Sequence, residues 1–420
     1  MCHITSLPNN GKKGDIKDSA FEFLEFLKEN KQTYWQILPL NPTDSYGSPY
    51  AGTSAFAANI DLTGQSFFEL KTEYETIGDS KEFQLFCKEN EEWLRPYAMY
   101  IALKQRNNNT CWQEWDKKYR DYDENLWEDE KLAKEAYVYQ YCQYKFFCMW
   151  SKVRKRATEY GINIIGDMPM YVSYDSADVW ANKEYFTLNS KGYPSMIAGV
   201  PPDYFAKEGQ LWGNPLFDWE KLKQDNYKWW IDRLKRSFAL YDYVRMDHFR
   251  GFESYYAVPE NEKATKGKWK FGPGAELFEV AKKQLKELPV LAEDLGIITP
   301  AVRALVSKCG FLGMDIIQFY DGDPLAEYIP KRDKVVYSGT HDNETLVGWC
   351  EERYKDKEPL EAADELLEKI YETDADLIII PLQDLQRLDN TARMNVPGTS
   401  KNNWSWQADS LKIVELKQEK

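Results

Sequence analysis

Three short apolar runs of this chain each stop abruptly at a carboxylate. The acids that end them are Asp247, Glu293 and Asp342. Short apolar runs bounded by polar residues are typical of buried strands. In a parallel α/β barrel the catalytic groups stand at the carboxyl ends of the strands. The pattern therefore favours a parallel α/β fold that presents acidic chemistry at one end of its sheet.

Arg245 and Asp247 lie two residues apart at the end of the first of these runs. On a strand both side chains then point to the same side. An adjacent cation favours the ionised carboxylate, which is the form that a nucleophile requires. A structural Arg–Asp pair is the alternative, and this pair alone does not separate the two. The other acids favour chemistry, because two carboxylates are the minimum for glycoside cleavage.

The rest of the chain alternates strand-like runs with amphipathic helices. Residues 20–28, for example, carry apolar side chains at helical spacing, and Thr299 with Pro300 is typical of a helix start. The run before Asp342 includes the strand 335–337. Besides the three runs, strands are expected at 33–38, 161–167, 314–319 and 375–380, with a stub of a first strand at Cys2–Ile4. Eight strands separated largely by helices predict a (β/α)8 TIM barrel, an α/β fold, with residues 1–420 as one catalytic unit.

Two stretches interrupt this alternation. Residues 62–150 are strongly charged and rich in Trp and Tyr. They predict an inserted, largely helical subdomain, with a long helix near 135–156 and with Trp112, Trp115 and Trp150 as packing residues. Residues 171–219 have little periodicity and many Gly, Pro and aromatic residues. They predict a loop-rich insertion that lines the cleft, where functional residues concentrate.

Composition and charge exclude several classes of function. The net charge is −14 and no Lys/Arg-rich stretch occurs, so nucleic acid is not an expected partner. No run reaches the ~18 apolar residues needed to span a bilayer. The seven Cys show no paired spacing, so we expect reduced thiols in a cytoplasmic protein, without an apolar signal region. The His residues lack ligand spacing, so neither a metal nor another cofactor is expected.

A series of motifs in chain order carries a family resemblance. They are Trp35–Leu40, Ser48–Tyr50, Gly166–Pro169, Gly199–Asp203, Leu211–Pro215, Arg245–Gly251, Gly272–Gly274, Ala292–Gly296, Gly339–Asn343 and Ala392–Thr399. Together they closely resemble signatures of the 4-α-glucanotransferases (amylomaltase or disproportionating enzyme) of the α-amylase clan, over nearly the whole chain. The resemblance implies transfer of α-1,4-glucan segments from a maltooligosaccharide or starch-type donor to the 4-OH of a glucose or glucan acceptor.

The resemblance also implies roles for the three acids in a retaining double displacement. Asp247 matches the nucleophile, Glu293 the acid/base, and Asp342 the residue that holds ring hydroxyls in the distorted transition state. A retaining mechanism needs two carboxyls ~5–5.5 Å apart. Glu293 must carry a proton near neutral pH, and neighbouring carboxylates would raise its pKa.

Sugar-binding positions follow from the same resemblance. The matching residues are Ser48, Tyr50, Asp167, Trp212, Arg245, His341 and Asn395, and a flexible aromatic loop near the acceptor is matched by Asp203, Tyr204 and Phe205. His248 suits either a sugar contact or a buried structural role, and each of the other positions has a structural alternative.

The match departs from the family at Gln407, where the family has Arg, and in the loop 9–15.

Three alternative functions stay open. A retaining α-glucan hydrolase would share the first half-reaction, and the choice depends on how well the acceptor site excludes water. A non-catalytic glucan-binding protein would not need all three acids. An unrelated barrel binding metal through Asp and His would need ligand spacing that is missing. Chain-length preference and oligomeric state are not readable from the sequence.

Overall fold

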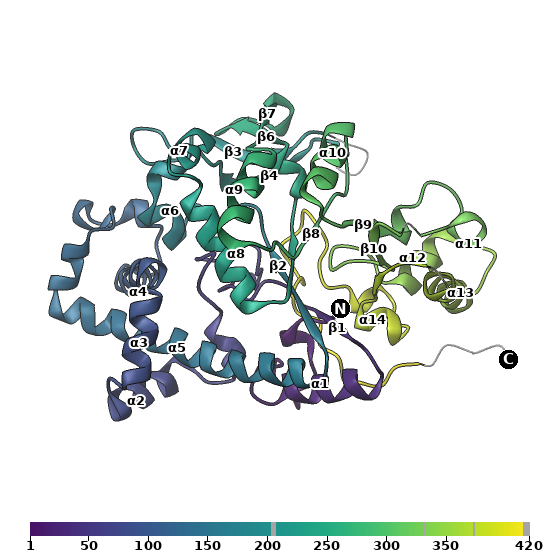
Figure 1. Ribbon diagram of the computed structural model, residues 1–420, viewed down its shortest axis with the longest axis horizontal. Coiled ribbons are helices and arrows are strands. Elements are labelled where there is room, and N and C mark those ends of the chain that lie inside the picture. The colour runs from purple at the N-terminus through teal and green to yellow at the C-terminus, as the bar shows by residue number, and fades with distance from the viewer. Residues whose placement is uncertain (203–206, 331, 373, 415–420) are drawn as a thin grey trace.

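The parallel strands lie side by side in the order that a barrel requires. The computed structural model describes residues 1–202, 207–330, 332–372 and 374–414. One parallel sheet has the order β1 (Tyr34–Gln36), β2 (Asn163–Met168), β5 (Tyr243–Met246), β8 (Val290–Ala292), and a second has the order β11 (Leu377–Ile379), β10 (Lys334–Tyr337), β9 (Gly313–Ile316). Figure 1 shows these strands in the middle of the molecule.

Contacts at two places join the sheets into a ring. The end of β8 and the residues before β9 meet at a parallel bridge. On the other side, the backbone nitrogen of Met1 lies 2.5 Å from the carbonyl oxygen of Ile380, and that of Cys2 lies 3.0 Å from the oxygen of Gln36. Met1 and Cys2 thus occupy the place of a first strand between β11 and β1. The predicted stub is shorter than expected, because Ile4–Ser6 forms a 3-10 helix.

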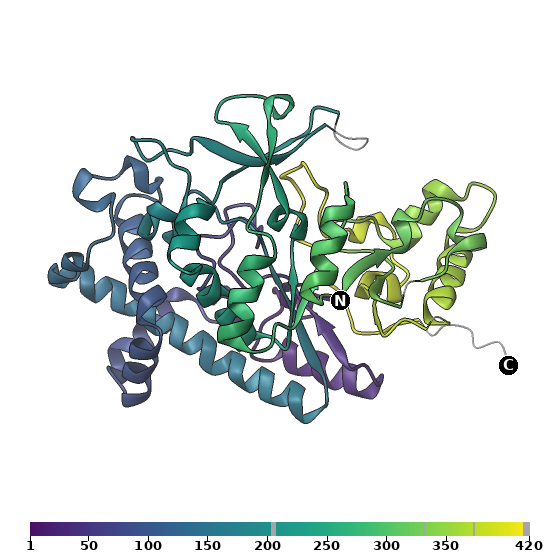
Figure 2. The same ribbon diagram turned by 45° about the horizontal axis from the view of Figure 1, so that its top comes forward.

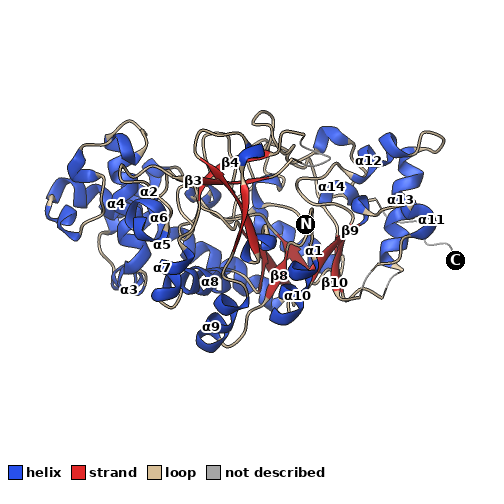
Figure 3. Ribbon diagram, turned by 90° about the horizontal axis from the view of Figure 1, so that it is seen from above, coloured by secondary structure: helices blue, strands red, loops and turns tan. Residues whose placement is uncertain are grey.

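Helices follow most of the strands and cover the ring (Figure 3). They are α1 (Ser19–Glu29), α8 (Lys228–Leu240), α9 (Ala275–Leu285), α10 (Pro300–Cys309), α12 (Leu346–Arg353) and α13 (Pro359–Tyr371), with the short α6 (Ala177–Ala181), α7 (Trp219–Gln224), α11 (Pro324–Glu327) and α14 (Leu382–Leu385). The side chain of Thr299 accepts a hydrogen bond from the nitrogen of Val302 and caps α10, as its sequence predicts. No helix in the described ranges combines the length and apolar character needed to cross a membrane.

The chain segment that connects β1 to β2 forms a group of helices, at the left of Figure 1. It consists of α2 (Phe67–Ile77), α3 (Lys81–Glu89), α4 (Glu91–Arg106) and α5 (Glu130–Glu159). The long helix expected near 135–156 is α5, which extends beyond that range at both ends. Trp112, Trp115 and Trp150 are buried, as expected of packing residues.

An antiparallel sheet that sequence patterning did not predict stands above the ring (Figure 2). Its order is β4 (Gln210–Pro215), β3 (Met196–Val200), β6 (Ser254–Pro259), β7 (Lys268–Phe271). The expectation of a loop-rich stretch at 171–219 was therefore wrong over β3 and β4. Gly, Pro and Asn in these strands have low β propensity, so only their pairing, of β3 with β6 and of β4 with β3, reveals them. Gly199 allows β4 to approach β3, since a Cβ there would lie 2.3 Å from the oxygen of Gln210 on β4.

The sixth parallel strand is also shorter than predicted. It ends at Ile316, and Ile317–Phe319 continues as a 3-10 helix. A buried apolar cluster that includes Ile165, Met314 and Tyr337 joins strands of the two parallel sheets. The ring of strands therefore encloses packed side chains, as barrels of this size do.

A substitution at Tyr337 tests this packing. Its hydroxyl donates to Oε1 of Gln36 over 2.8 Å, and both residues are buried. We expect Tyr337→Phe to lower the free energy of unfolding by about 1–3 kcal/mol, because the Gln36 oxygen loses its partner in the interior. Urea unfolding measures the change, with Tyr46→Phe on an exposed loop as control. Equal stabilities of parent and Tyr337→Phe would contradict the buried hydrogen bond.

Candidate active site

The guanidinium of Arg245 lies between two carboxylates at the ends of β2 and β5. Its Nη1 is 2.7 and 2.9 Å from the two Oδ atoms of Asp167, and its Nη2 is 3.1 Å from Oδ1 of Asp247. The Arg245 and Asp167 side chains are buried, whereas that of Asp247 is 30% exposed. The structure thus confirms the guanidinium–carboxylate pair expected from the spacing, and it adds Asp167 as a second anion.

Burial shapes the protonation of these groups. It raises the pKa of the Asp167 carboxyl; the Arg245 charge opposes this rise and the Asp247 charge adds to it. The pKa of Arg245 lies well above its ordinary value, because its carboxylate neighbours outweigh the effect of burial. Arg245 therefore stays charged and holds a fixed positive centre beneath Asp247.

Glu293 directly follows β8, as Asp247 directly follows the neighbouring strand β5. Met246 and Ala292 are paired in register on β5 and β8, so the residues that follow them emerge from neighbouring strands at the same level. The backbone nitrogen of His248 donates to Oε2 of Glu293 over 2.8 Å, and that of Leu295 donates to Oε1 over 2.9 Å. These two hydrogen bonds fix the carboxyl plane of Glu293.

The pKa of Glu293 is raised to about 7. Burial is the largest cause, and the negative charge of Asp247 raises it further, while Arg245 and the two backbone hydrogen bonds lower it. Two carboxyls on adjacent strands, both half-buried, thus differ in environment, since Asp247 is paired with a cation and Glu293 receives two backbone hydrogen bonds. Such a difference is how one site provides an acid and an anion at the same pH.

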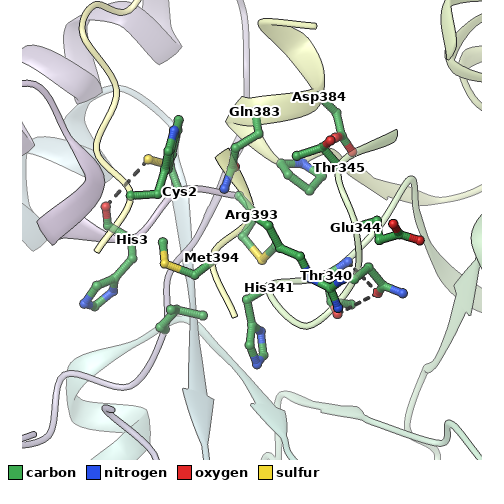
Figure 4. A pocket seen from close by; sticks show the side chains of 15 residues that line it. Cys2, His3, Thr340, His341, Glu344, Thr345, Gln383, Asp384, Arg393 and Met394 are labelled. Atoms are coloured by element: carbon green, nitrogen blue, oxygen red, sulfur yellow. Dashed lines mark hydrogen bonds between the residues drawn. The ribbon is translucent and has the colours of Figure 1, made fainter. Parts of the chain in front are cut away.

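Asp342 is held in the loop after β10 by three neighbours. Nδ2 of Asn395 donates to its Oδ1 over 2.6 Å, and Nε2 of His341 lies 3.4 Å from the same oxygen. Arg393 donates to the backbone oxygens of Asp342, at 2.6 Å, and of Asn395, at 2.9 Å. Figure 4 shows His341 and Arg393 in the wall of a pocket of about 430 Å³, which His3 also lines.

An aromatic cluster connects the Asp342 loop with Asp167. The ring of Tyr50 stacks on that of His341 with centroids 5.0 Å apart, and Trp404 lies 5.6 Å from Tyr50. The hydroxyl of Tyr50 donates to Oδ2 of Asp167 over 2.8 Å. Oγ of Ser48 accepts from the nitrogen of Tyr50 over 3.3 Å, so Ser48 positions this ring.

Trp212, on β4 of the antiparallel sheet, also lies at this site. Its ring meets that of His248 edge-on, with centroids 4.9 Å apart. Burial lowers the pKa of His248 to about 4, so this ring is neutral at physiological pH. The remaining expected residues, Asp203, Tyr204 and Phe205, lie outside the described residues.

Two residues that contact this site were not singled out from the sequence. Trp404 packs against Tyr50 and His341, and Arg393 fixes the backbone of Asp342 and Asn395. Arg393 lies in the motif Ala392–Thr399, which was the available signal, whereas Trp404 lies outside the motifs. The positions of Trp404 and Arg393 in the sequence do not indicate these contacts, because only the tertiary fold brings the two residues next to the loop after β10.

The arrangement suits a neutral, ring-shaped ligand with many hydroxyls. Aromatic rings stand beside hydrogen-bonding carboxylates, an amide and a histidine. In the part of the chain that the structure describes, no group of three or more His, Cys, Asp or Glu side chains converges as metal ligands do. The chemistry available to these residues is acid, base and nucleophilic chemistry of carboxyl groups.

Comparison with known families decides the assignment. A family model described as 4-alpha-glucanotransferase matches residues 2–66 and 62–412. The chain belongs to the 4-alpha-glucanotransferase family. Relatives of that name include one from Streptococcus pneumoniae, 38% identical over 464 aligned positions with 97% of this chain and 92% of that protein covered, and one from Synechocystis, 39% identical over 469 positions with 97% and 92% covered.

A solved structure of the family shares the fold over nearly the full length. The amylomaltase from Streptococcus agalactiae, in complex with acarbose, is 34% identical, with a TM-score of 0.88 over 97% of this chain and 94% of that one. The amylomaltase from Corynebacterium glutamicum, at 17% identity and a TM-score of 0.75 over 97% of this chain and 70% of that one, has the same fold. The α/β barrel described above is thus that of the 4-alpha-glucanotransferases.

The raised pKa of Glu293 has a consequence for stability. Between the ordinary pKa of 4.5 and about 7 the folded enzyme keeps a proton that the unfolded chain has lost. The parent therefore loses stability as pH rises through this window, and Glu293→Gln does not. We expect the free energy of unfolding of the variant, relative to the parent, to rise by up to about 3 kcal/mol between pH 4.5 and 8.

Urea unfolding across this pH range measures the difference. Glu262→Gln, which changes an exposed glutamate, is the control and should track the parent. The amide in Glu293→Gln also faces the two backbone donors, but the offset in stability that this causes is constant with pH and does not affect the test. A variant that parallels the parent throughout would show that Glu293 has no raised pKa.

Proposed function

We propose that this enzyme transfers α-1,4-glucan segments between maltooligosaccharides or starch-type chains by retaining double displacement, with Asp247 as nucleophile and Glu293 as acid/base. The observation that carries the proposal is the contrast between these two carboxyls on adjacent strands. Burial raises the pKa of the half-buried Glu293 carboxyl to about 7, whereas Asp247 is paired directly with Arg245. Membership of the family supports the same activity.

In the first step Asp247 attacks the anomeric carbon, and the glycosidic bond breaks. Glu293 gives its proton to the departing oxygen, so the shortened glucan leaves with a free hydroxyl. A β-linked glucosyl ester of Asp247 remains. In the second step Glu293 takes a proton from the 4-OH of a glucose or glucan acceptor, and that oxygen displaces Asp247 and restores the α linkage.

The neighbouring residues are proposed to bind the donor sugar. Asp342, held by Asn395 and His341, accepts hydrogen bonds from ring hydroxyls as the ring flattens toward its cation-like transition state. Tyr50 offers an aromatic face, and Trp212 offers a second beside His248. The relative from Streptococcus agalactiae was solved with acarbose, which supports a carbohydrate ligand for this arrangement.

Water is the competing acceptor. A retaining hydrolase would use the same first step, so the preference for a sugar hydroxyl depends on excluding water from the glucosyl ester. The packing of Trp212 against the rings of Tyr171 and His248 supports that exclusion. All seven cysteines are free thiols, which supports work in the reducing cytoplasm.

Incubation with maltotriose tests this proposal. A ladder of longer chains together with glucose is expected, whereas glucose and maltose alone would indicate hydrolysis. Asp247→Asn keeps the shape of the side chain but removes the nucleophile, so the rate should fall by at least about 10³-fold. Asp356→Asn, on an exposed loop, should leave the rate unchanged. Activity of Asp247→Asn within tenfold of the parent, with reversion to Asp excluded by mass, would refute the nucleophile.

A further inference from the structure

The loop that carries Asp342, residues 339–343, is closed at its base by one buried amide. Gln318 lies just beyond β9, in the short 3-10 helix that follows this strand, and only 9% of it is exposed. Its Nε2 donates to the backbone oxygen of Ser338 over 3.1 Å and to that of Glu344 over 3.0 Å. Gln318 thus binds the residue before the loop and the residue after it.

The register of the strands places Gln318 beside this loop. Ile316 of β9 and Tyr337 of β10 are paired, so the side chain of Gln318 meets the chain where it leaves β10. Gly339 lets the amide come close, since a Cβ on it would lie 2.8 Å from Nε2 of Gln318. A side-chain amide has two hydrogens to donate, and both are used here. The two ends of the loop therefore converge on one nitrogen.

Hydrogen bonds inside the loop connect this base to Asp342. The nitrogen and Oγ1 of Thr340 both donate to Oδ1 of Asn343, over 2.9 and 2.8 Å, and the nitrogen of Asp342 lies 3.3 Å from Oγ1 of Thr340. Figure 4 shows Thr340 and His341 on this loop. The loop is a compact turn, so the direction of the Asp342 carboxylate depends on how the base of the turn is held.

Gln318 ties this turn to a different part of the barrel from the other contacts of Asp342. Arg393 and Asn395 approach Asp342 from the stretch that follows β11 and α14. Gln318 follows β9, and β9 is joined to β8, the strand that Glu293 follows, by a parallel bridge. The amide of Gln318 therefore fixes the Asp342 loop relative to the side of the barrel that bears the acid/base.

We propose that Gln318 is a positioning residue for the transfer reaction, which holds Asp342 where its carboxylate meets the ring hydroxyls in the transition state. The inference rests on the proposed function, which gives Asp342 that role. Gln318 acts through the backbone, because its amide is directed to two carbonyl oxygens of the chain. A misplacement of about 1 Å at a reacting centre can lower the rate by 10²-fold, so loss of this amide should act mainly on kcat.

Gln318→Met tests the amide, because it keeps the length of the side chain and removes both hydrogen bonds. We expect kcat for maltotriose to fall by about 10–10²-fold and KM to stay within about threefold, since the lost interaction is one made in the transition state. Fluoride release in the first turnover of α-glucosyl fluoride should fall by the same factor. This donor needs no proton from Glu293 but still passes through the transition state that Asp342 stabilises.

The fluoride measurement separates the two acids. Parent-like fluoride release beside slow turnover of maltotriose would place the defect at Glu293 and would overturn the proposal. A double-mutant cycle then separates positioning from a general loss of structure. In the Asp342→Ala background there is no carboxylate to position, so adding Gln318→Met should change fluoride release by less than about threefold. The same 10–10²-fold loss in both backgrounds would also overturn the proposal.

Gln140→Met is the matched control. Gln140 is a buried glutamine of α5, 2% exposed, and its Oε1 accepts from Sγ of Cys87 over 3.5 Å. This substitution changes the same side chain in the same way at a place remote from the acids, so both rates should stay within about twofold of the parent. A loss of kcat equal to that of Gln318→Met would show that any buried glutamine has this effect and would contradict a positioning role.

Gly339→Ala is a second variant with the same expected outcome, and it replaces Gln318→Met if circular dichroism shows that Gln318→Met does not fold. The backbone of Gly339 lies outside the left-handed region, and the added Cβ displaces the amide of Gln318. Parent-like rates of the folded variants would refute the proposal. Failure of the parent to disproportionate maltotriose would instead refute the proposed function, whatever the rates of the Gln318 variants.

Discussion

The contact on which the rest of the site depends is the guanidinium of Arg245 between Asp167 and Asp247. Three charges are held within hydrogen-bonding distance at the ends of two neighbouring strands. Removing one partner from a buried group of this kind costs about 3–5 kcal/mol, because the remaining charge is left without compensation. The barrel sets this geometry, since parallel strands in register bring the side chains of consecutive strands to one level. Tyr50 extends the network from Asp167 to His341.

The environment, more than the residue type, separates the proposed roles of the two reacting carboxyls. Glu293 is half-buried and receives two backbone hydrogen bonds, and its raised pKa results mainly from burial. Asp247 keeps contact with solvent and with Arg245. The same negative charge that makes Asp247 a nucleophile helps to keep the proton on Glu293. After glucosylation that charge is neutralised, so Glu293 loses its proton more readily and is ready to act as the base of the second step.

Much of this could be predicted from the sequence because it is local. An apolar run that ends in an acid predicts both the strand and the place of the carboxylate, and Arg245 with Asp247 follows from spacing alone. The features that the sequence did not predict depend on contacts between distant segments of the chain. Strands β3 and β4 have weak propensity and form only because β3 pairs with β6 and β4 pairs with β3. Trp404 contacts Tyr50 only in the folded protein.

The most direct test of the central claim uses Glu293→Ala with α-glucosyl fluoride and azide. Fluoride leaves without a proton, so Asp247 should still be glucosylated, and the second step should stall without a base. Azide needs no base and should restore turnover from the side that Glu293 vacated, giving the α-azide. Turnover of the natural substrate should stay lowered by about 10²–10⁴-fold or more. Absence of rescue, or formation of the β-azide, would contradict a covalent intermediate on Asp247 with Glu293 as acid/base.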